Sequence, residues 1–451
     1  MSGQSADRDE HPNLSASRDP PGSGAPARQP VGKIHPQPWM TAPETRALLE
    51  ALAEGGSEVR FIGGCVRDAI LKRPVRDIDL ALPLPPEFFM TLLRQRGIKV
   101  IPTGVDHGTV TAVVGPMHFE ITSLRMDVET YGRRARVAFT DDWIADAARR
   151  DFTFNALSCT PEGDVYDYFD GLEDLGHGRV RFVGSARERI GEDVLRLLRF
   201  FRFYAHYGRP PPDEEALAAC REWAEKVQTL SGERVRVEVF RTLMATDPAD
   251  VFQLMRDWRV LEHVLPEADD LARLRMLSWL DSRALRMDSV VPDPVRRLAA
   301  LLQPERAEVD IVTARLRLSA HQKDRLAVML RRPHPFDPDG GVHAVTRALY
   351  HLGPEAVRDL TLLAWAAELA GARRSVRGRS ERWTALLHRI DTWHPIEFPL
   401  KGRDALALGI SPGPRMGILL HKVEQWWEDA GYRPNRDECL RRLRELIAVG
   451  E

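Results

Sequence analysis

The sequence predicts an α+β fold in which a small N-terminal head with a mixed sheet is followed by a long all-helical part. Two patterns predict it. Short apolar runs alternate with helical segments between Glu58 and Leu124. Beyond about Arg187, apolar residues recur at spacings of three and four almost to the end of the chain. With 43% hydrophobic and 29% charged residues in 451, the composition is typical of a globular protein and excludes a disordered or collagen-like chain.

Charge, hydropathy and cysteine usage narrow the class of protein further. The 64 basic and 66 acidic residues leave a net charge of −2, so an RNA-binding surface has to come from a local cluster of basic side chains. No run of about eighteen uncharged apolar residues occurs and no signal peptide is visible, so we expect no membrane association. The four cysteines are widely spaced, which argues against a zinc site or a disulfide framework and favours a cytoplasmic location.

The expected elements follow in order along the chain. Residues 1–38 are rich in Ser, Pro, Gly and Asp, and we expect a disordered tail there. In the head, the pattern predicts strands at 59–62, 78–82, 110–114 and 119–124 and helices at 66–71 and 85–94. In the remainder it predicts helices at 190–207, 214–227, 235–244 and 251–265, with breaks rich in Pro and Gly near 209–212, 333–341 and 395–402.

Two acidic residues of the second predicted strand carry the chemistry. Asp77 and Asp79 stand two positions apart, so both side chains point to the same face of a strand. Such a pair can hold one or two Mg²⁺ ions, and two ions about 4 Å apart stabilise both the attacking and the leaving oxygen of a phosphoryl transfer. Gly63 and Gly64, between a strand and a helix, leave backbone N–H groups accessible to a polyphosphate.

Each of these features alone has an ordinary explanation. An Asp-x-Asp pair often lies on a solvated strand edge, and a Gly-Gly pair is often only a turn. A strand, a Gly-Gly pair, a helix and an acidic strand in immediate succession are far more specific. The combination therefore favours nucleotide chemistry over a solvated surface.

A family resemblance rests on residues 61–68, Phe-Ile-Gly-Gly-Cys-Val-Arg-Asp, and on residues 76–79, Arg-Asp-Ile-Asp. Together they resemble the first motif of the polymerase β-type nucleotidyltransferases. More narrowly, they resemble the class II tRNA nucleotidyltransferases (CCA-adding enzymes) and their bacterial poly(A) polymerase relatives. Further matches follow in the family's order at residues 149–156, 170–175, 192–199, 231–235 and 402–414. The resemblance covers about residues 40–445.

The resemblance implies a domain organisation and a set of site residues. It implies a catalytic head at 39–183, a nucleotide-selecting neck at 184–268, a helical body at 269–370 and a tRNA-binding tail at 371–451. Asp77 and Asp79 would bind metal, and Glu120 would be a third acidic residue near it, although a solvated glutamate on an alternating strand is an equal alternative. The nucleotide would be bound by Gly63, Gly64, Arg67, Arg149, Arg150, Asp151, Asn155, Asp193, Arg196, Arg199 and Arg202.

Residues 193–202 indicate how a protein can choose a nucleotide without a template. Asp193 and Arg196 lie at i and i+3, so in a helix they are neighbours on one face, and Arg199 and Arg202 continue the row. Cytosine and adenine each offer an amino donor beside a ring-nitrogen acceptor, which a carboxylate and an arginine can pair. Uracil and guanine reverse that order and leave buried groups unpaired. The ordinary alternative is a surface ion pair.

Two further segments are candidates for function. The polar segment 126–142 predicts a mobile loop and resembles the flexible loop that CCA-adding enzymes use when they switch from C to A; the alternative is an ordinary surface loop. A basic cluster could bind tRNA phosphates, or could be a solvated loop. It comprises Arg373, Arg374, Arg377 and Arg379.

Three functions remain open at this point. The first is addition of CCA to tRNA from CTP and ATP with Mg²⁺ as cofactor. The second is polyadenylation, or addition of only CC or only A. The third is RNA binding by an inactive protein of the same fold, against which intact Asp77 and Asp79 argue. Residues 103–109, Thr-Gly-Val-Asp-His-Gly-Thr, resemble the CCA-adding branch. The expected partners are tRNA, CTP and ATP, with neither a membrane nor a protein partner implied.

Overall fold

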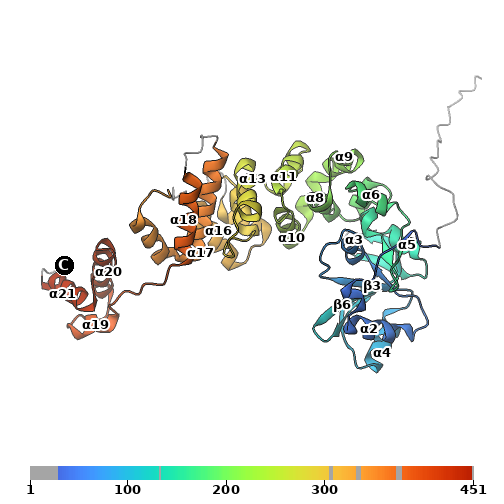
Figure 1. Cartoon of the computed structure of the whole chain (residues 1–451), viewed down its shortest axis with the longest axis horizontal. Helices are drawn as coiled ribbons and strands as arrows, with labels where there is room; N and C mark the ends of the chain where they lie inside the picture. The colour runs from blue at the N-terminus through green and yellow to red at the C-terminus, as the bar shows by residue number, and fades with distance from the viewer. Residues whose placement is uncertain (1–28, 132–133, 304–307, 332–336, 372–377, 449–451) are drawn as a thin grey trace, which may run out of the picture. The chain divides into compact units, whose positions relative to one another are not determined.

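The structure is a computed structural model that describes residues 29–131, 134–303, 308–331, 337–371 and 378–448. The chain divides into two compact units. The first, the head, comprises the chain up to Thr130 together with Arg134–Gly176, and the second, the helical unit, begins at His177. The predicted α+β fold is confirmed, because all the named strands lie before residue 170 and the described elements after it are helical (Figure 1).

The head is built on a mixed sheet. Within the described residues this sheet has eight strands in the order β1-β10-β9-β2-β3-β6-β5-β4. Paired neighbours run antiparallel, except that β3 and β6 are parallel. The strands are β1 (Gly32–Lys33), β2 (Arg60–Ile62), β3 (Ile78–Leu82), β4 (Lys99–Gly104), β5 (Thr109–Val114), β6 (Met117–Ser123), β9 (Ser158–Cys159) and β10 (Asp164–Tyr166). Inward-facing Phe61, Leu80 and Ile121 are fully buried and form the core under the sheet.

Short helices cover this sheet. α2 and α4 pack on each other and on β5, and α3 packs on β2 and β3 (Figure 1). The helices of the head are α1 (Pro38–Thr41), α2 (Pro43–Ala53), α3 (Gly64–Ile70), α4 (Pro86–Gln95), α5 (Trp143–Ala148) and α6 (Gly171–His177), with short 3₁₀ turns at Val105–His107 and Thr153–Asn155. The side chain of Asp142 caps α5 by accepting a bond from the N–H of Ile144 (2.8 Å).

Two expectations for the head are wrong in part. The predicted disordered tail extends too far, because β1 pairs with β10 and α1 begins at Pro38; residues 1–28 lie outside the described residues. The segment 126–142, expected as a loop, contains two paired strands, β7 (Arg125–Tyr131) and β8 (Arg134–Phe139). Alternating polar residues hid this hairpin, because neither strand carries a continuous apolar run.

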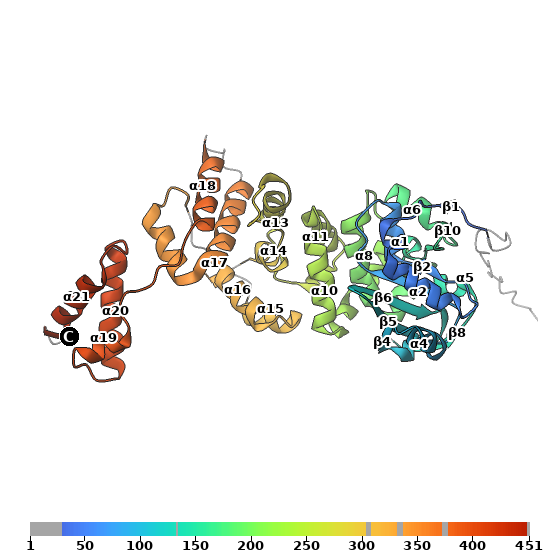
Figure 2. The same cartoon turned by 60° about the horizontal axis from the view of Figure 1, so that its bottom comes forward.

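The helical unit is a succession of packed helices, seen from a second direction in Figure 2. Among the described residues, no helix is long and apolar enough to cross a membrane. The helices are α7 (Ala186–Glu192), α8 (Leu195–Tyr207), α9 (Glu214–Trp223), η3 (Ala224–Thr229), α10 (Gly232–Leu243), α11 (Pro248–Asp257), α12 (Leu261–Val264), α13 (Leu271–Trp279), η4 (Leu280–Ala284), α14 (Pro294–Leu301), α15 (Val309–Leu316), α16 (Ala320–Arg331), α17 (Val342–Ala370), α18 (Arg379–Asp391), α19 (Gly402–Ala407), α20 (Pro414–Asp429) and α21 (Arg436–Ala448).

Two of the predicted helices are interrupted, and one helix for which no bounds were predicted is kinked. The predicted helix 190–207 is interrupted between Glu192 and Leu195, and the predicted helix 251–265 is interrupted between α11 and α12. α17 is kinked at Gly353, whose φ of +78° is not helical and which precedes Pro354. The boundaries between neck, body and tail stay predictions.

Candidate active site

The acidic pair lies on β3, near the middle of the head sheet. Asp79 is in the strand and Asp77 immediately precedes it, while Ile78 and Leu80 between and beyond them are buried in the core. β3 runs parallel to β6, and the register pairs Asp79 with Glu120. Because directly paired residues project from the same face of a sheet, Glu120 stands beside the two aspartates. The sequence-predicted acidic residues are therefore brought together.

The pKa of Asp79 is raised to about 6 at this position. Burial of the carboxyl group is the largest cause, and the negative charge of Glu120 is the next. Asp77 adds to the effect, whereas Arg150 and Arg67 oppose it. The buried carboxylate and its acidic neighbours are groups whose charged form a bound cation would stabilise.

The acidic residues suit a metal ion that a substrate also coordinates. Among the described residues, no group of three or more His, Cys, Asp or Glu side chains could hold a metal by itself. A protein site for Mg²⁺ usually supplies only one or two carboxylates, and water and substrate phosphates fill the other positions. Asp77 and Asp79 fit that donor set, and Glu120 does not complete a three-residue cage.

Gly63 and Gly64 form the turn between β2 and α3. Gly63 has φ of +66°, a conformation that L side chains rarely adopt, and its N–H donates to the Leu157 carbonyl (3.0 Å). A Cβ on Gly63 would lie 3.5 Å from Arg150 Nη1, and one on Gly64 would lie 3.7 Å from Arg67 Nη2. Side chains here would fill the space in front of both guanidinium groups, so the glycines keep that space open.

A network of side chains fixes Arg67. Its Nε and Nη2 donate to both oxygens of Asp68 (3.0 and 2.9 Å), and its Nη1 donates to Asn155 Oδ1 (2.6 Å). The Asn155 amide in turn donates to Asp151 (3.0 Å), whose carboxylate also accepts from the N–H of Phe152 (2.9 Å). The predicted nucleotide-binding residues Arg67, Asn155 and Asp151 are therefore in contact, and all three are buried.

Arg149 and Arg150 share a partner that sequence reasoning missed. Buried Asp146 accepts from Arg149 Nη2 (2.6 Å) and from Arg150 Nη2 (2.8 Å). These two positive charges hold the pKa of the Asp146 carboxyl below its usual range despite burial. Arg149 also donates to the carbonyl of Arg125 at the start of the hairpin (3.2 Å). Asp146 stands three residues before Arg149 and four before Arg150, and this helical spacing was the signal that could have identified it.

The helical unit holds the predicted base-selecting residues, with one correction. Asp193 does not lie in a helix with Arg196; it has an extended backbone after α7, and α8 begins at Leu195. The Asp193 carboxylate accepts from Arg234 (2.7 Å) and from the N–H of Leu195 (3.1 Å). Arg196 donates to Glu192 and to the Arg189 carbonyl (3.1 Å). Partners outside the predicted pair therefore hold both residues.

The other two arginines of the row meet one buried carboxylate. Glu238 of α10, with only 4% of its side chain exposed, contacts Arg202 Nε at 2.5 Å and Arg199 Nη1 at 4.0 Å. Arg202 also lies over the ring of Phe203, 4.1 Å from its centroid. Arg199 and Arg202 thus connect α8 to α10, which gives them a supporting position.

Arg234 and Glu238 were missed as site residues, although the sequence contained a signal. Arg234 lies within the Ser-Gly-Glu-Arg-Val segment at 231–235 and Glu238 follows it, but this segment was given only as a match to the family, without a role for its residues. The structure confirms the start of α10 there, with Ser231 at the cap position. Their partners are 36 to 41 residues away in sequence, so no local pattern pairs them.

The predicted RNA-binding cluster is described only at Arg379. Arg373, Arg374 and Arg377 lie outside the described residues. Arg379 contacts Glu368 (2.8 Å), Asp337 (3.0 Å) and Asp339 (2.6 Å). These three carboxylates engage its guanidinium within the helical unit, so a role in RNA binding stays a prediction.

Two family models match the chain. One, described as "Poly A polymerase head domain", matches residues 59–181. The other, described as "Probable RNA and SrmB- binding site of polymerase A", matches residues 212–271. The first covers the acidic strand and the glycine turn, and the second covers α10 with Arg234 and Glu238.

Curated relatives and solved structures match over nearly the whole chain. The "CCA-adding enzyme" of Leuconostoc citreum is 36% identical, covering 91% of this chain and 97% of the relative. The human "CCA tRNA nucleotidyltransferase 1, mitochondrial" is 33% identical, covering 88% of each. The structure of the Bacillus stearothermophilus CCA-adding enzyme in complex with CTP shares the fold, with a TM-score of 0.72 at 23% identity over 90% of this chain and 97% of that one. The chain therefore belongs to the family of CCA-adding tRNA nucleotidyltransferases.

Proposed function

We propose that this protein adds CCA to the 3′ end of tRNA, using CTP and ATP and releasing pyrophosphate. The observation that supports this most strongly is similarity to CCA-adding enzymes through head and helical unit alike, together with an intact acidic pair on β3. An enzyme of this class needs a nucleotidyl-transfer site and a separate surface for a large RNA, and the chain offers two units for these tasks.

The proposed metal is Mg²⁺, held by Asp77 and Asp79. Members of the family generally use a divalent cation. When bound, it lowers the pKa of the attacking hydroxyl and neutralises charge that develops on the phosphates. Hard carboxylate oxygens suit Mg²⁺, and the register places a third carboxylate, that of Glu120, beside Asp79. We assign Glu120 to accepting the proton from O3′ of the RNA, because it stands beside Asp79 in the register.

The glycine turn and the arginine network are assigned to the triphosphate and ribose. Gly63 and Gly64 leave the approach to Arg67 and Arg150 open, so these guanidinium groups can pair with phosphate oxygens. Asn155, held between Arg67 and Asp151, is assigned to the ribose together with Arg149 and Asp151. A network whose members already contact one another loses little entropy when it binds the nucleotide.

Asp193 and Arg196 are assigned to base selection. The Asp193 carboxylate would accept from the amino group of C or A, and Arg196 would donate to the ring nitrogen. Arg234 and Glu192 hold these two side chains in place, which supports a fixed template made of protein. Uracil or guanine would leave the Asp193 carboxylate and the Arg196 guanidinium without a partner, at a cost of roughly 1–3 kcal/mol for each group.

The assay is extension of a tRNA that ends at the discriminator base, with one nucleoside triphosphate supplied at a time. CTP alone should add two residues, and ATP should add one residue only after CTP has acted. The family model that matches the head is described as a poly(A) polymerase domain, so poly(A) polymerase activity is a second candidate. A long tail with ATP alone would favour that activity, and arrest after CC or addition of A only would identify a partial enzyme.

A further inference from the structure

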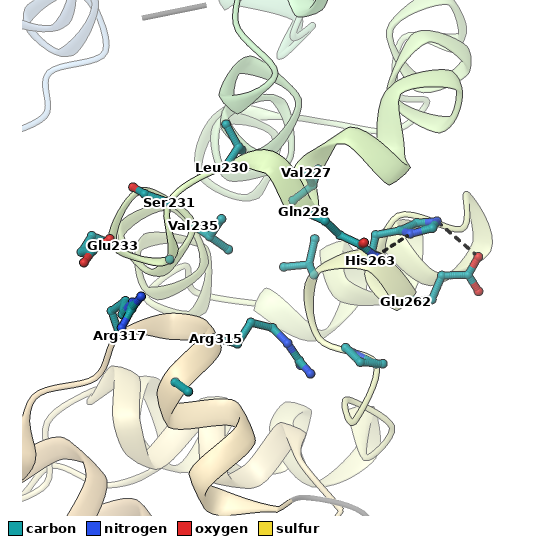
Figure 3. Close-up of a pocket in the computed structure, with 14 residues that line it drawn as sticks. Val227, Gln228, Leu230, Ser231, Glu233, Val235, Glu262, His263, Arg315 and Arg317 are labelled. Atoms are coloured by element: carbon teal, nitrogen blue, oxygen red, sulfur yellow. Dashed lines mark hydrogen bonds and ion pairs between the residues drawn. The ribbon is translucent and has the colours of Figure 1, made fainter.

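A cavity of about 500 Å³ lies within the helical unit. Its walls come from η3, the first turn of α10, α12 and the last turn of α15. Figure 3 shows Gln228 and His263 on one side, Ser231 and Val235 on the other, and Arg315 beneath. The volume lies within the range of pockets that bind small organic molecules. None of the catalytic or nucleotide-binding residues assigned above lines it.

One part of the lining is aliphatic. Val227 and Leu230 come from the end of η3 and the residues after it, Val235 from α10, and Val264 and Pro266 from the end of α12 and the loop after it. Aliphatic surface of this kind packs against a flat, uncharged group and gains from excluding water. It offers little to a purely ionic ligand such as free phosphate.

The other part of the lining is polar and carries two arginines from the end of α15. Arg315 is oriented by Glu267, with an Nη1–Oε2 distance of 2.5 Å. Arg317 is exposed, and the described residues offer its guanidinium no ion pair. Across the cavity, the amide of Gln228 and the ring of His263 lie 3.5 Å apart and add further hydrogen-bonding groups.

The backbone at Arg317 is in the conformation that glycine prefers. Its φ is +50° at the end of α15, and its carbonyl accepts a bond from Arg236. A non-glycine residue there costs roughly 1–2 kcal/mol, and glycine is the usual choice at this position. A glycine does occur nearby, at Gly232, where α10 meets α15. Any Cβ at Gly232 would come 2.2 Å from the Arg315 carbonyl oxygen. An arginine side chain is thus kept at a strained position beside the cavity.

We propose that this cavity binds one nucleotide of the tRNA substrate, with its base against the aliphatic wall and its phosphate at Arg315 and Arg317. The proposal rests on tRNA being the substrate. Single-stranded RNA bases are commonly recognised by stacking or packing of the base and ionic contact to the phosphate. Glu233 and Glu262 also line the cavity and oppose an anion, so Arg315 and Arg317 are the residues of the lining whose fixed charge favours the phosphate. The lining apart from Ala314 and the two arginines falls within residues 212–271, the segment with the RNA-binding description.

The first test replaces Arg317 by glycine. Arg317→Gly removes the cation and suits the backbone, so the melting temperature should stay the same or rise. The dissociation constant for tRNA should increase about tenfold, and its salt dependence should fall by about one charge. Arg259→Gly is the matched control, because Arg259 is also exposed at a positive φ (+56°) and does not line the cavity. An equal loss in both variants would overturn the proposal, since it would indicate general charge attraction.

The second test reads the cavity directly. Wild-type protein is crosslinked to tRNA that carries 4-thiouridine, and the crosslinked peptides are mapped by mass spectrometry. We expect crosslinks within residues 227–235 or 262–266, and we expect Ala314→Phe, which fills the exposed α15 side of the cavity, to abolish them. If neither segment is crosslinked to tRNA, the proposal is contradicted. Loss of these crosslinks in excess AMP would instead assign the cavity to a free nucleotide and overturn the tRNA assignment.

The outcomes of these two tests can be distinguished from a failure of the proposed function. If the wild-type protein adds CCA and both cavity variants bind tRNA normally, only the cavity proposal fails. If the wild-type protein adds nothing to tRNA, the crosslinks still show whether RNA enters the cavity. The variants should leave the KM for CTP unchanged, because no residue of the acidic strand or glycine turn lines the cavity.

Discussion

The neighbours of Asp79 decide what this residue can do. Its backbone lies in a buried strand, and its carboxyl group is next to Glu120 and Asp77, so its ionised form is unfavourable without a compensating charge. Arg150 and Arg67 supply part of that charge. A divalent cation would supply the remainder, so we expect the acidic pair to be more sensitive to substitution than the other residues of the head.

We expect Asp77→Asn and Asp79→Asn each to lower the rate of nucleotide addition by at least about a thousandfold, because an amide oxygen binds a hard cation poorly. The measurement is single-turnover addition of C to tRNA. Mg²⁺ should raise the melting temperature of the wild-type protein and not that of either variant. Asp142→Asn is the control, since asparagine can also cap α5. Full activity in both site variants would refute the metal assignment.

The cysteines test how tightly the interior is packed. All four are free and buried. Burial raises the pKa of the Cys65 and Cys159 thiols to about 12, and those of Cys220 and Cys439 also lie above the ordinary value. At pH 8 the reactive thiolate is therefore scarce. A thiol-specific disulfide reagent should label none of the four in minutes in the native protein and all four in guanidinium. Rapid native labelling would contradict this packing.

Among the secondary-structure elements, the break between α7 and α8 is the most informative. A continuous helix would have aligned Asp193 with Arg196, as the sequence pattern predicted. Instead the chain leaves the helix at Asp193, and its carboxylate bonds to Arg234 and to the first N–H of α8. This break frees the carboxylate from the helix surface and fixes its direction from two sides. Selecting a base by two edge contacts requires such a fixed direction.

Arg234→Gln should therefore reduce base selectivity without unfolding the protein. The ratio of C to U incorporation should fall about tenfold, because the Asp193 carboxylate loses the guanidinium group of Arg234 that orients it. Arg241→Gln on the same helix is the control, since Arg241 is exposed and it is Arg234, not Arg241, that bonds to the Asp193 carboxylate. The measurement compares kcat/KM for CTP and UTP. Unchanged selectivity in Arg234→Gln, with a normal circular dichroism spectrum, would show that Asp193 does not depend on this pair.

The same elements show how far sequence reasoning reaches. The four strands and two helices predicted for the head lie within a few residues of β2, β3, β5, β6, α3 and α4, because apolar runs and the glycine turn at Gly63 are local signals. The remaining helices of the head and strands β4, β9 and β10 were not predicted. The hairpin of β7 and β8 and strand β1 were missed, since pairing across the sheet, and not apolar content, stabilises them. Asp193 was placed in a helix because apolar residues recur at helical spacing over 190–207, and its partner Arg234, 41 residues away, gives no local signal of the break. The residues that hold the site together were thus harder to predict than the residues that form it.

Taken over the whole chain, the two units use charge differently. In the head, Asp79 and Glu120 lie side by side at the candidate site, whereas in the helical unit the most deeply buried charges join helices to one another. Arg297 is fully buried and donates to Asp281 (2.5 and 3.1 Å) and to the carbonyls of Leu243 (2.6 Å) and Ala245 (2.8 Å). This one side chain links α14 to η4 and to the end of α10, so it bears on the helix that carries Arg234 and Glu238.

Removing that charge should destabilise the helical unit more than most single changes. Arg297→Met leaves Asp281 buried without its main partner, which costs roughly 3–5 kcal/mol. We expect a lower melting temperature and weaker tRNA binding near that temperature, with normal CTP addition well below it, because no assigned catalytic residue contacts Arg297. Adding Asp281→Leu removes the stranded carboxylate and should restore part of the stability. If the single variant melts like the wild-type protein, this ion pair does not hold the helices together; if the double variant melts lower than the single one, the cost lies in lost packing and not in an unpaired charge.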